Sequence, residues 1–123
     1  MLSQISFIQK EYKSRFLVKT VEGLVSLQID EIAYFYIDNQ ASIVKTHENS
    51  RYNLDKTLDE MERLVDPKKF FRLNRQCIAS INAIDKIQNH FNYALKIELK
   101  PPIDKEIIVS RYSTKEFKEW LDI

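Results

Sequence analysis

Arg72, Asn74 and Arg75 stand close together near the middle of the chain, after the aromatic pair Phe70-Phe71 and before an apolar run that ends at Ile84. Arginine and asparagine side chains carry planar forks of hydrogen-bonding groups that match the major-groove edges of guanine and adenine, and arginine also pairs with phosphate. Because side chains alternate along an extended strand, we expect Arg72 and Asn74 to share one face unless a turn intervenes. The stretch predicts a rigid strand that presents polar forks to a nucleic acid, and the alternative is an arginine–carboxylate network at the surface.

Positive charge is concentrated in this region, although the chain as a whole is nearly neutral. The net charge of +1 excludes the overall basic field of a general nucleic-acid binder. Lys68 and Lys69 precede Arg72 and Arg75, and no acidic residue lies between them, whereas five acids lie just upstream: Asp55, Asp59, Glu60, Glu62 and Asp66. This segregation predicts a local patch of cations that neutralises phosphates.

Residues that could support catalysis or bind a metal are few. His47 and His90 are the only histidines, and neither has the spacing of a metal ligand pair. Cys77 begins an apolar strand, where thiols are usually inert packing, so a dyad of Cys77 with a histidine is the remaining enzymatic alternative. With Gly23 as the single glycine, a glycine-rich phosphate loop is excluded. No enzymatic activity, metal or cofactor is predicted.

The composition is that of one ordinary soluble domain, with 123 residues of which 44% are hydrophobic and 30% charged. The longest apolar stretch, Ile32–Ile37, is too short to span a membrane. Met1–Lys10 has no signal-peptide pattern, and a lone cysteine fits a reducing compartment. These features predict a cytoplasmic protein without membrane contact.

Short strands separated by polar turns are expected over most of the chain. Residues 1–14 are interpreted as an N-terminal tether or loosely docked arm, and residues 15–123 as the folded domain. Alternation of apolar and polar residues begins at Arg15, and Glu22-Gly23 supplies the first turn. Further strands are expected at Val25–Ile29, Ile32–Ile37, Ala41–His47, Arg51–Leu54, Ile78–Ile84, Leu95–Leu99 and Ile107–Val109. The segment Asp85–Gln88 is charged or amphipathic.

Two short helices complete the predicted fold. Thr57 with Glu60, and Ser113 with Glu116, have the spacing of capping boxes. Apolar residues at helical spacing follow each box: Leu58, Met61 and either Leu64 or Val65 in the first, and Phe117, Trp120 and Leu121 in the second. Many short strands with two small helices indicate a mainly β domain.

Two loops and one arginine leave a structural and a binding role open. Asp38-Asn39-Gln40 is expected to be a hairpin turn, from which Asn39, Gln40 and Ser42 would reach base edges if the loop faced DNA. Most aromatic residues are assigned to the core, but Phe91 lies in a loop rich in turn formers and could stack on a base. Arg111 precedes the second helix and would pair either with an acid or with a nucleic acid.

The order of these motifs resembles the LytTR DNA-binding domain of bacterial response regulators. The resemblance spans roughly Ser14 to Leu121 and depends on the combination of motifs: Phe16-Leu17-Val18-Lys19, Ile32-Ala33-Tyr34-Phe35, the helix with Leu58, Phe70-Phe71-Arg72 with Arg75, Ile78–Ile84, Val109-Ser110-Arg111 and Trp120-Leu121. It implies an elongated stack of short antiparallel β-sheets with small helices. Such domains insert loop side chains into successive major grooves of promoter repeats.

The resemblance also implies which residues contact DNA. The implied contacts are Asn39, Gln40, Ser42 and Ile43 in the loop after Phe35, then Asn74 and Arg75, then Arg111. Arg72 is expected to contact phosphate or to buttress the central loop, and Lys68 and Lys69 are expected to contact phosphate. The family commonly has histidine where this chain has Asn74, and asparagine where it has Ser80. The shorter Ser80 is expected to lose a structural hydrogen bond.

The predicted function is sequence-specific binding of double-stranded DNA by a transcriptional regulator, as the effector domain of a two-component response regulator. The implied partners are repeated promoter sites, an upstream receiver domain if the chain is a fragment, and a second copy in a dimer on DNA. The alternative is a β-rich protein-interaction module that uses exposed strand edges or the Phe91 loop.

Overall fold

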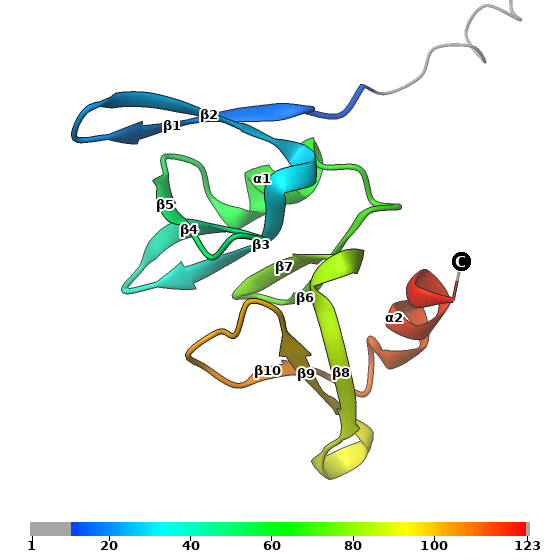
Figure 1. The fold of residues 1–123 in the computed structure, drawn as a ribbon. Helices are drawn as coiled ribbons and strands as arrows, with labels where there is room; N and C mark the ends of the chain where they lie inside the picture. Colours follow the sequence, from blue (N-terminus) through cyan, green and yellow to red (C-terminus); the bar gives the residue numbers. More distant parts are fainter. Residues whose placement is uncertain (1–10, 123) are drawn as a thin grey trace, which may run out of the picture.

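The computed structural model describes residues 11–122, in which ten short strands form three antiparallel sheets and two α-helices pack against them (Figure 1). The strands are β1 (Arg15–Thr20), β2 (Gly23–Gln28), β3 (Ile32–Asp38), β4 (Ala41–Thr46), β5 (Arg51–Leu54), β6 (Phe70–Asn74), β7 (Cys77–Ser80), β8 (Ile84–Asn89), β9 (Leu95–Leu99) and β10 (Ile107–Val109). The helices are α1 (Leu58–Leu64) and α2 (Thr114–Leu121). The predicted mainly β class with two small helices is confirmed.

The sheets are stacked along the length of the molecule. A five-stranded sheet with the order β5-β4-β3-β7-β6 lies in the middle. The β1–β2 hairpin lies at one end, and the three-stranded sheet β10-β9-β8 lies at the other (Figure 1). This arrangement is the elongated stack that the family resemblance implies.

Strand β3 lies at the centre of the middle sheet and supplies side chains to two separate cores. Phe35 belongs to the core under the β1–β2 hairpin and α1, where its ring lies 5.8 Å from that of Phe16. Tyr34 and Tyr36 belong to the other core, which the three-stranded sheet and α2 cover. Burial of β3 on both faces follows from its continuous apolar run.

The helices begin and end largely where local sequence signals predict. At α1, the Glu60 N–H donates to Thr57 Oγ1 at 3.1 Å and the Thr57 N–H donates to Glu60 Oε1 at 3.3 Å, which is the predicted capping box. The second predicted box does not form, because the Ser113 side chain makes no cap hydrogen bond. The Thr114 hydroxyl instead donates to the Arg111 carbonyl at 3.1 Å.

One strand prediction is wrong, and one strand was not predicted. The central stretch is a hairpin rather than one rigid strand, because the chain turns at Arg75-Gln76 between β6 and β7 and leaves the sheet after Ser80. The segment Ile84–Asn89, which includes the region interpreted only as charged or amphipathic, is strand β8 and pairs with β9.

The N-terminal segment is only partly described, since residues 1–10 of the predicted tether lie outside the described residues. Next to β1, the Lys13 N–H donates to the Leu64 carbonyl and the Ile29 N–H donates to the Ser14 carbonyl, both at 2.9 Å. The boundary at residue 15 stays a prediction. No helix within residues 11–122 is long and apolar enough to cross a membrane.

Candidate nucleic-acid interface

The turn between β6 and β7 is shaped by the side chain of Asn74. Its Oδ1 accepts a hydrogen bond from the Gln76 N–H at 2.8 Å, and its Nδ2 donates to the Ile108 carbonyl at 3.1 Å. The first bond stabilises the turn, and the second joins β6 to β10, the edge strands of two different sheets. Asn74 is therefore first a structural residue, and its contact with DNA stays a prediction.

Arg72 holds this turn from the side. Its Nε donates to the Asn74 carbonyl and one Nη to the Arg75 carbonyl, both at 2.8 Å. The other Nη donates to carboxylate oxygens of α1, at 2.8 Å for Asp59 and 3.0 Å for Glu62. The Arg72 side chain is only 19% exposed, so the structure favours the predicted buttress over the predicted phosphate contact.

The pairing with Arg72 changes the pKa of one of its carboxylate partners. The hydrogen bond and the positive charge of Arg72 lower the pKa of the Asp59 carboxyl below its ordinary value of 3.8. Asp59 and Glu62 stand 13 and 10 residues before Arg72, so no local spacing pattern pointed to them.

Arg75 stands at the turn itself, and its side chain is exposed. Arg75 lines a hollow together with Asn74, Ile108 and Ser110. Asp59 and Glu62 line the same hollow, and their carboxylates are engaged with Arg72. Within residues 11–122 the Arg75 guanidinium has no ion pair, so it is available to an outside anion or base.

Arg111 is exposed and is held by its neighbour Tyr112. One Nη donates to the Tyr112 hydroxyl at 2.6 Å, and the guanidinium carbon lies 4.8 Å from the centre of the ring. No carboxylate pairs with Arg111 in the described part of the chain. Tyr112 was not among the predicted site residues, although an aromatic residue in a polar turn beside an arginine is a usable signal.

The two arginines line adjoining hollows. The hollow of Arg111 and the hollow of Arg75 share Ile108 and Ser110, at the end of β10. The predicted arginine–carboxylate alternative applies to Arg72 and does not apply to Arg75 or Arg111. The geometry therefore combines, on neighbouring parts of the surface, two guanidinium forks that have no carboxylate partner within residues 11–122.

The turn between β3 and β4 lies at the same end of the middle sheet as the Arg75 turn. The Ile37 N–H, just before the turn, donates to the Gln76 carbonyl at 3.0 Å. Asn39 and Gln40 are exposed and occupy the left-handed region, with φ values of 49° and 68°. Two such residues in succession produce the tight hairpin turn that suits the twist of β-strands.

Two predicted contacts beyond this turn are not at the surface. Ile43 is 1% exposed and packs in the core that contains Tyr34 and Tyr36, so a direct DNA contact from Ile43 is wrong. Ser42 is 9% exposed and lies between its neighbours Ile37 and Leu54 in the sheet. Alternation along β4 directs Ile43 into this core and its neighbour Val44 into the core that contains Phe35, so this part of β4 is buried on both faces.

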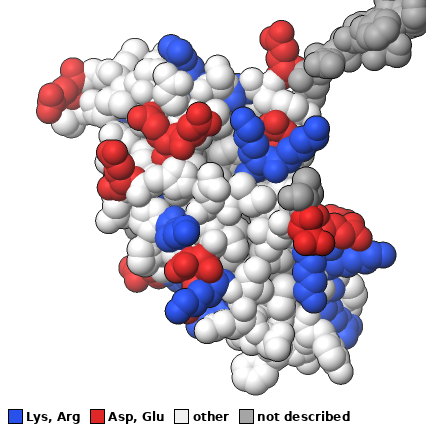
Figure 2. All heavy atoms as spheres, turned by 45° about the vertical axis from the view of Figure 1, so that its right-hand side comes forward, with Lys and Arg blue, Asp and Glu red and all other residues white. Residues whose placement is uncertain are grey.

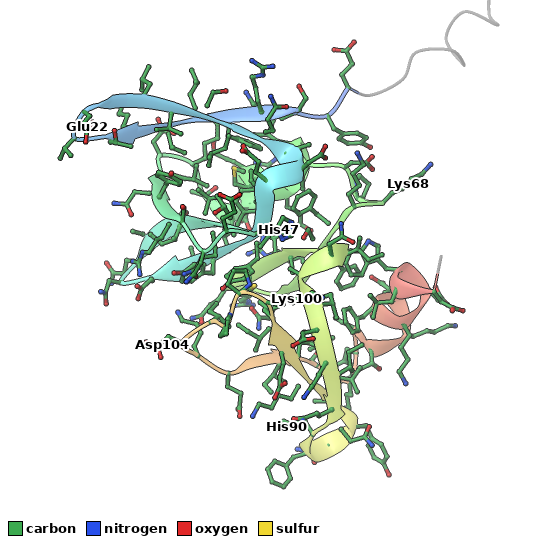
Figure 3. All side chains as sticks on the ribbon, viewed as in Figure 1. Glu22, His47, Lys68, His90, Lys100 and Asp104 are labelled. Carbon is green, nitrogen blue, oxygen red and sulfur yellow. The ribbon has the colours of Figure 1, made fainter. Side chains whose placement is uncertain are left out.

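The predicted patch of four cations is divided in the structure. Lys68 and Lys69 are exposed, but they precede β6, whereas Arg75 follows it. A strand of five residues separates the two positions by about 16 Å, and Arg72 between them is neutralised by its carboxylates. Lys68 projects away from the body of the molecule (Figure 3). Its contact with phosphate stays a prediction.

The candidate catalytic residues, Cys77, His47 and His90, lie outside the hollows of Arg75 and Arg111, except that His90 lines the hollow of Arg111. Cys77 is buried, and desolvation raises the pKa of its thiol to about 12. In the part of the chain that the structure describes, no three His, Cys, Asp or Glu side chains come together to hold a metal ion. His47 lies in the turn after β4, whereas Cys77 begins β7, and His90 lies at the far end of the molecule (Figure 3).

Comparison with known proteins identifies the family. The family model of the LytTr DNA-binding domain matches residues 22–122. The chain belongs to the LytTR DNA-binding domain family. The LytTR fold is also found in a solved LytTr DNA-binding domain, from a protein described as a methyl-accepting/DNA response regulator of Bacillus cereus. That structure superposes with a TM-score of 0.75 and 21% identity, over 90% of this chain and 99% of that domain.

Two curated relatives match most of this chain. Both are named sensory transduction protein LytT, one from Bacillus cereus and one from Bacillus anthracis. Each is 32% identical to this chain over 102 residues, which covers 83% of this chain and 40% of the relative. The chain thus spans less than half the length of these relatives.

Proposed function

We propose that this LytTR domain recognises specific sequences in double-stranded promoter DNA, as the effector domain of a two-component response regulator. The observation that carries the proposal is the pair Arg75 and Arg111, two exposed guanidinium groups that line adjoining hollows and have no carboxylate partner among residues 11–122. Membership in a DNA-binding family supports duplex DNA as the ligand.

The chemistry of the two arginines fits base recognition. An arginine fork donates two parallel hydrogen bonds to O6 and N7 of guanine in the major groove, and it can also pair with phosphate. Arg72 and Asn74 hold the backbone of the Arg75 turn, and Tyr112 holds the Arg111 guanidinium, so both are positioned before DNA arrives. Preorganised donors lose less conformational entropy on binding.

The turn Asn39-Gln40 supplies a third contact in this proposal. Both side chains are exposed beside the Arg75 turn, and their amides can donate to and accept from base edges. Left-handed residues other than glycine are uncommon and concentrate at functional sites. The conformation of this turn therefore supports a role in binding.

The proposal extends to the whole regulator. The name sensory transduction protein, carried by the relatives, supports a receiver domain joined upstream of the DNA-binding domain. The family resemblance supports repeated promoter sites and a dimer on DNA, and a role on promoter DNA supports a location in the bacterial cytoplasm. Separate domains would allow phosphorylation of one to change how two copies of the other meet on DNA.

Selection from random duplexes, followed by fluorescence anisotropy on the selected sequence, tests the proposal. Arg75→Ala and Arg111→Ala should each weaken binding about 10- to 100-fold, because a bidentate arginine–guanine contact is worth about 1–3 kcal/mol. Both variants should unfold at the wild-type temperature, since both side chains are exposed.

Arg15→Ala is the matched control, because it removes an exposed arginine from β1, outside both hollows. It should bind as the wild type does. Wild-type affinity for Arg75→Ala and Arg111→Ala together would refute the assigned roles. If the domain binds no duplex even at low salt, the result would favour the alternative, a protein-interaction module.

A further inference from the structure

Exposed aromatic side chains gather at the end of the molecule opposite the β1–β2 hairpin. Phe91 and Tyr93, in the turn between β8 and β9, are 80% and 87% exposed, and Tyr112 after β10 is 80% exposed. This end is the lowest part of Figure 1, and in Figure 2 its tip shows no charged side chain. A group of large aromatic residues in water indicates an interaction surface.

The turn that carries Phe91 and Tyr93 has a defined backbone. The His90 N–H donates to the Ala94 carbonyl at 3.0 Å, and the Ala94 N–H donates to the Phe91 carbonyl at 3.1 Å. Asn92 and Tyr93 occupy the left-handed region, with φ values of 55° and 62°. That region is disfavoured by about 1–2 kcal/mol for a residue such as tyrosine. The exposed rings are thus presented from a specific turn.

The chemistry around these rings suits a polyanion. Phe91, Asn92 and His90 line one hollow together with Arg111 and Tyr112, and none of the residues lining this hollow is acidic. Tyr93 lines a neighbouring hollow whose only charged residue is Lys118.

One carboxylate near this turn, that of Glu106, pairs with Lys96. Glu106 lies 4.0 Å from His90 Nε2 and 3.7 Å from Lys96 Nζ. The surface therefore combines apolar rings, amides and cations, which are the groups that pack on deoxyribose and bond to phosphate.

The aromatic end, defined as Phe91, Tyr93 and Tyr112, is continuous with the proposed DNA surface. Its hollow contains Arg111 and shares Ile108 and Ser110 with the hollow of Arg75. We infer that the aromatic end packs against the sugar–phosphate backbone of duplex DNA beside the groove that Arg111 enters, an inference that rests on the proposed function. The contact lengthens the bound segment of DNA.

A double variant tests the inference. Phe91→Ala removes one ring, and Tyr93→Asn removes the other with a residue that tolerates the left-handed backbone. The double variant should bind the selected duplex about tenfold more weakly, because apolar surface no longer packs on sugar. The slope of affinity against salt should stay at its wild-type value, because no phosphate charge is neutralised by these rings. Hydroxyl-radical footprinting should show lost protection at one end of the site only.

Leu17→Ala with Leu24→Ala is the matched control. These leucines are 63% and 64% exposed on the β1–β2 hairpin, at the opposite end of the molecule (Figure 1), so their double variant should bind as the wild type does. If the aromatic variant has wild-type affinity and footprint, the inference is overturned and the rings serve another partner, such as a protein. If the wild-type domain binds no duplex, the proposed function itself fails, and the two failures are distinct.

Discussion

The guanidinium of Arg72 donates a hydrogen bond to the main-chain oxygen of Arg75 at 2.8 Å. One arginine thereby fixes the backbone from which the other projects. The side chain of Arg72 is turned inward and paired, whereas that of Arg75 is exposed and unpaired within the described residues. Two arginines three positions apart thus have opposite roles, and only their surroundings distinguish them.

Replacement of the buttress should reduce both stability and binding. Arg72→Ala removes donors from the carbonyls of Asn74 and Arg75, which should lower the free energy of unfolding by about 1–3 kcal/mol in urea titrations. DNA affinity should also fall, because the Arg75 turn loses its support. Arg51→Ala is the control, since Arg51 forms an exposed pair with Asp38 at 2.8 Å, and such pairs contribute about 0–1 kcal/mol. Equal losses in the two variants would contradict the buttress.

The two lysines before β6 should affect all DNA sequences alike. Lys68→Ala and Lys69→Ala should weaken binding to selected and random duplexes by the same factor, because a phosphate contact reads no base. Each should also reduce the slope of log affinity against log salt by about 1. Lys19→Ala, on the β1–β2 hairpin, supplies the control for charge alone. An unchanged slope would show that neither lysine meets a phosphate.

The hydroxyl of Ser80 should be dispensable. Ser80 is 6% exposed, and its Oγ has no hydrogen-bond partner within the described residues. Ser80→Ala should therefore leave the free energy of unfolding unchanged or raise it by up to about 1 kcal/mol. Thr46→Val is the contrast, because the buried Thr46 Oγ1 accepts a hydrogen bond from the Ser50 N–H at 3.0 Å. This variant should lower the free energy of unfolding by about 1 kcal/mol. A comparable loss in both would reveal a partner for Ser80.

The thiol of Cys77 should be unreactive in the native protein. Burial raises its pKa to about 12, so iodoacetamide at pH 8 should label it far more slowly in the native state than in urea, as followed by mass spectrometry. Because the folded pKa exceeds the ordinary value of 9.0, the free energy of unfolding should decline as the pH rises above about 9. Ser26→Cys, on the exposed side of β2, provides an accessible thiol for comparison. Equal labelling of the two thiols would contradict the burial.

Much of the fold follows from local signals in the sequence. The alternation that begins at Arg15, the buried run at Ile32–Ile37 and the capping box at Thr57 each predict an element that the structure contains, because side-chain period and capping depend on neighbouring residues. The missed strand β8 carries few apolar side chains. Its extended conformation is set by pairing with β9, and the pattern of neighbouring residues cannot predict such pairing.

The candidate site is harder to predict from the sequence than the fold is. The identities of Arg75 and Arg111 point to them, and no local pattern shows that Arg72 would be paired inward with Asp59. The turn at Arg75-Gln76 contains no glycine or asparagine, so it lacks the usual hairpin signal. Its conformation depends on Asn74, which reaches across to Ile108 in another sheet. Contacts between distant segments decide these roles.

Strand β3 contributes alternate side chains to both cores, with Phe35 on one side and Tyr34 on the other. Unfolding of β3 would expose both cores to water at once, so we expect no stable intermediate in which only one half of the domain is folded. Urea should consequently melt the β1–β2 hairpin and the three-stranded sheet at one common midpoint, as a single cooperative unit.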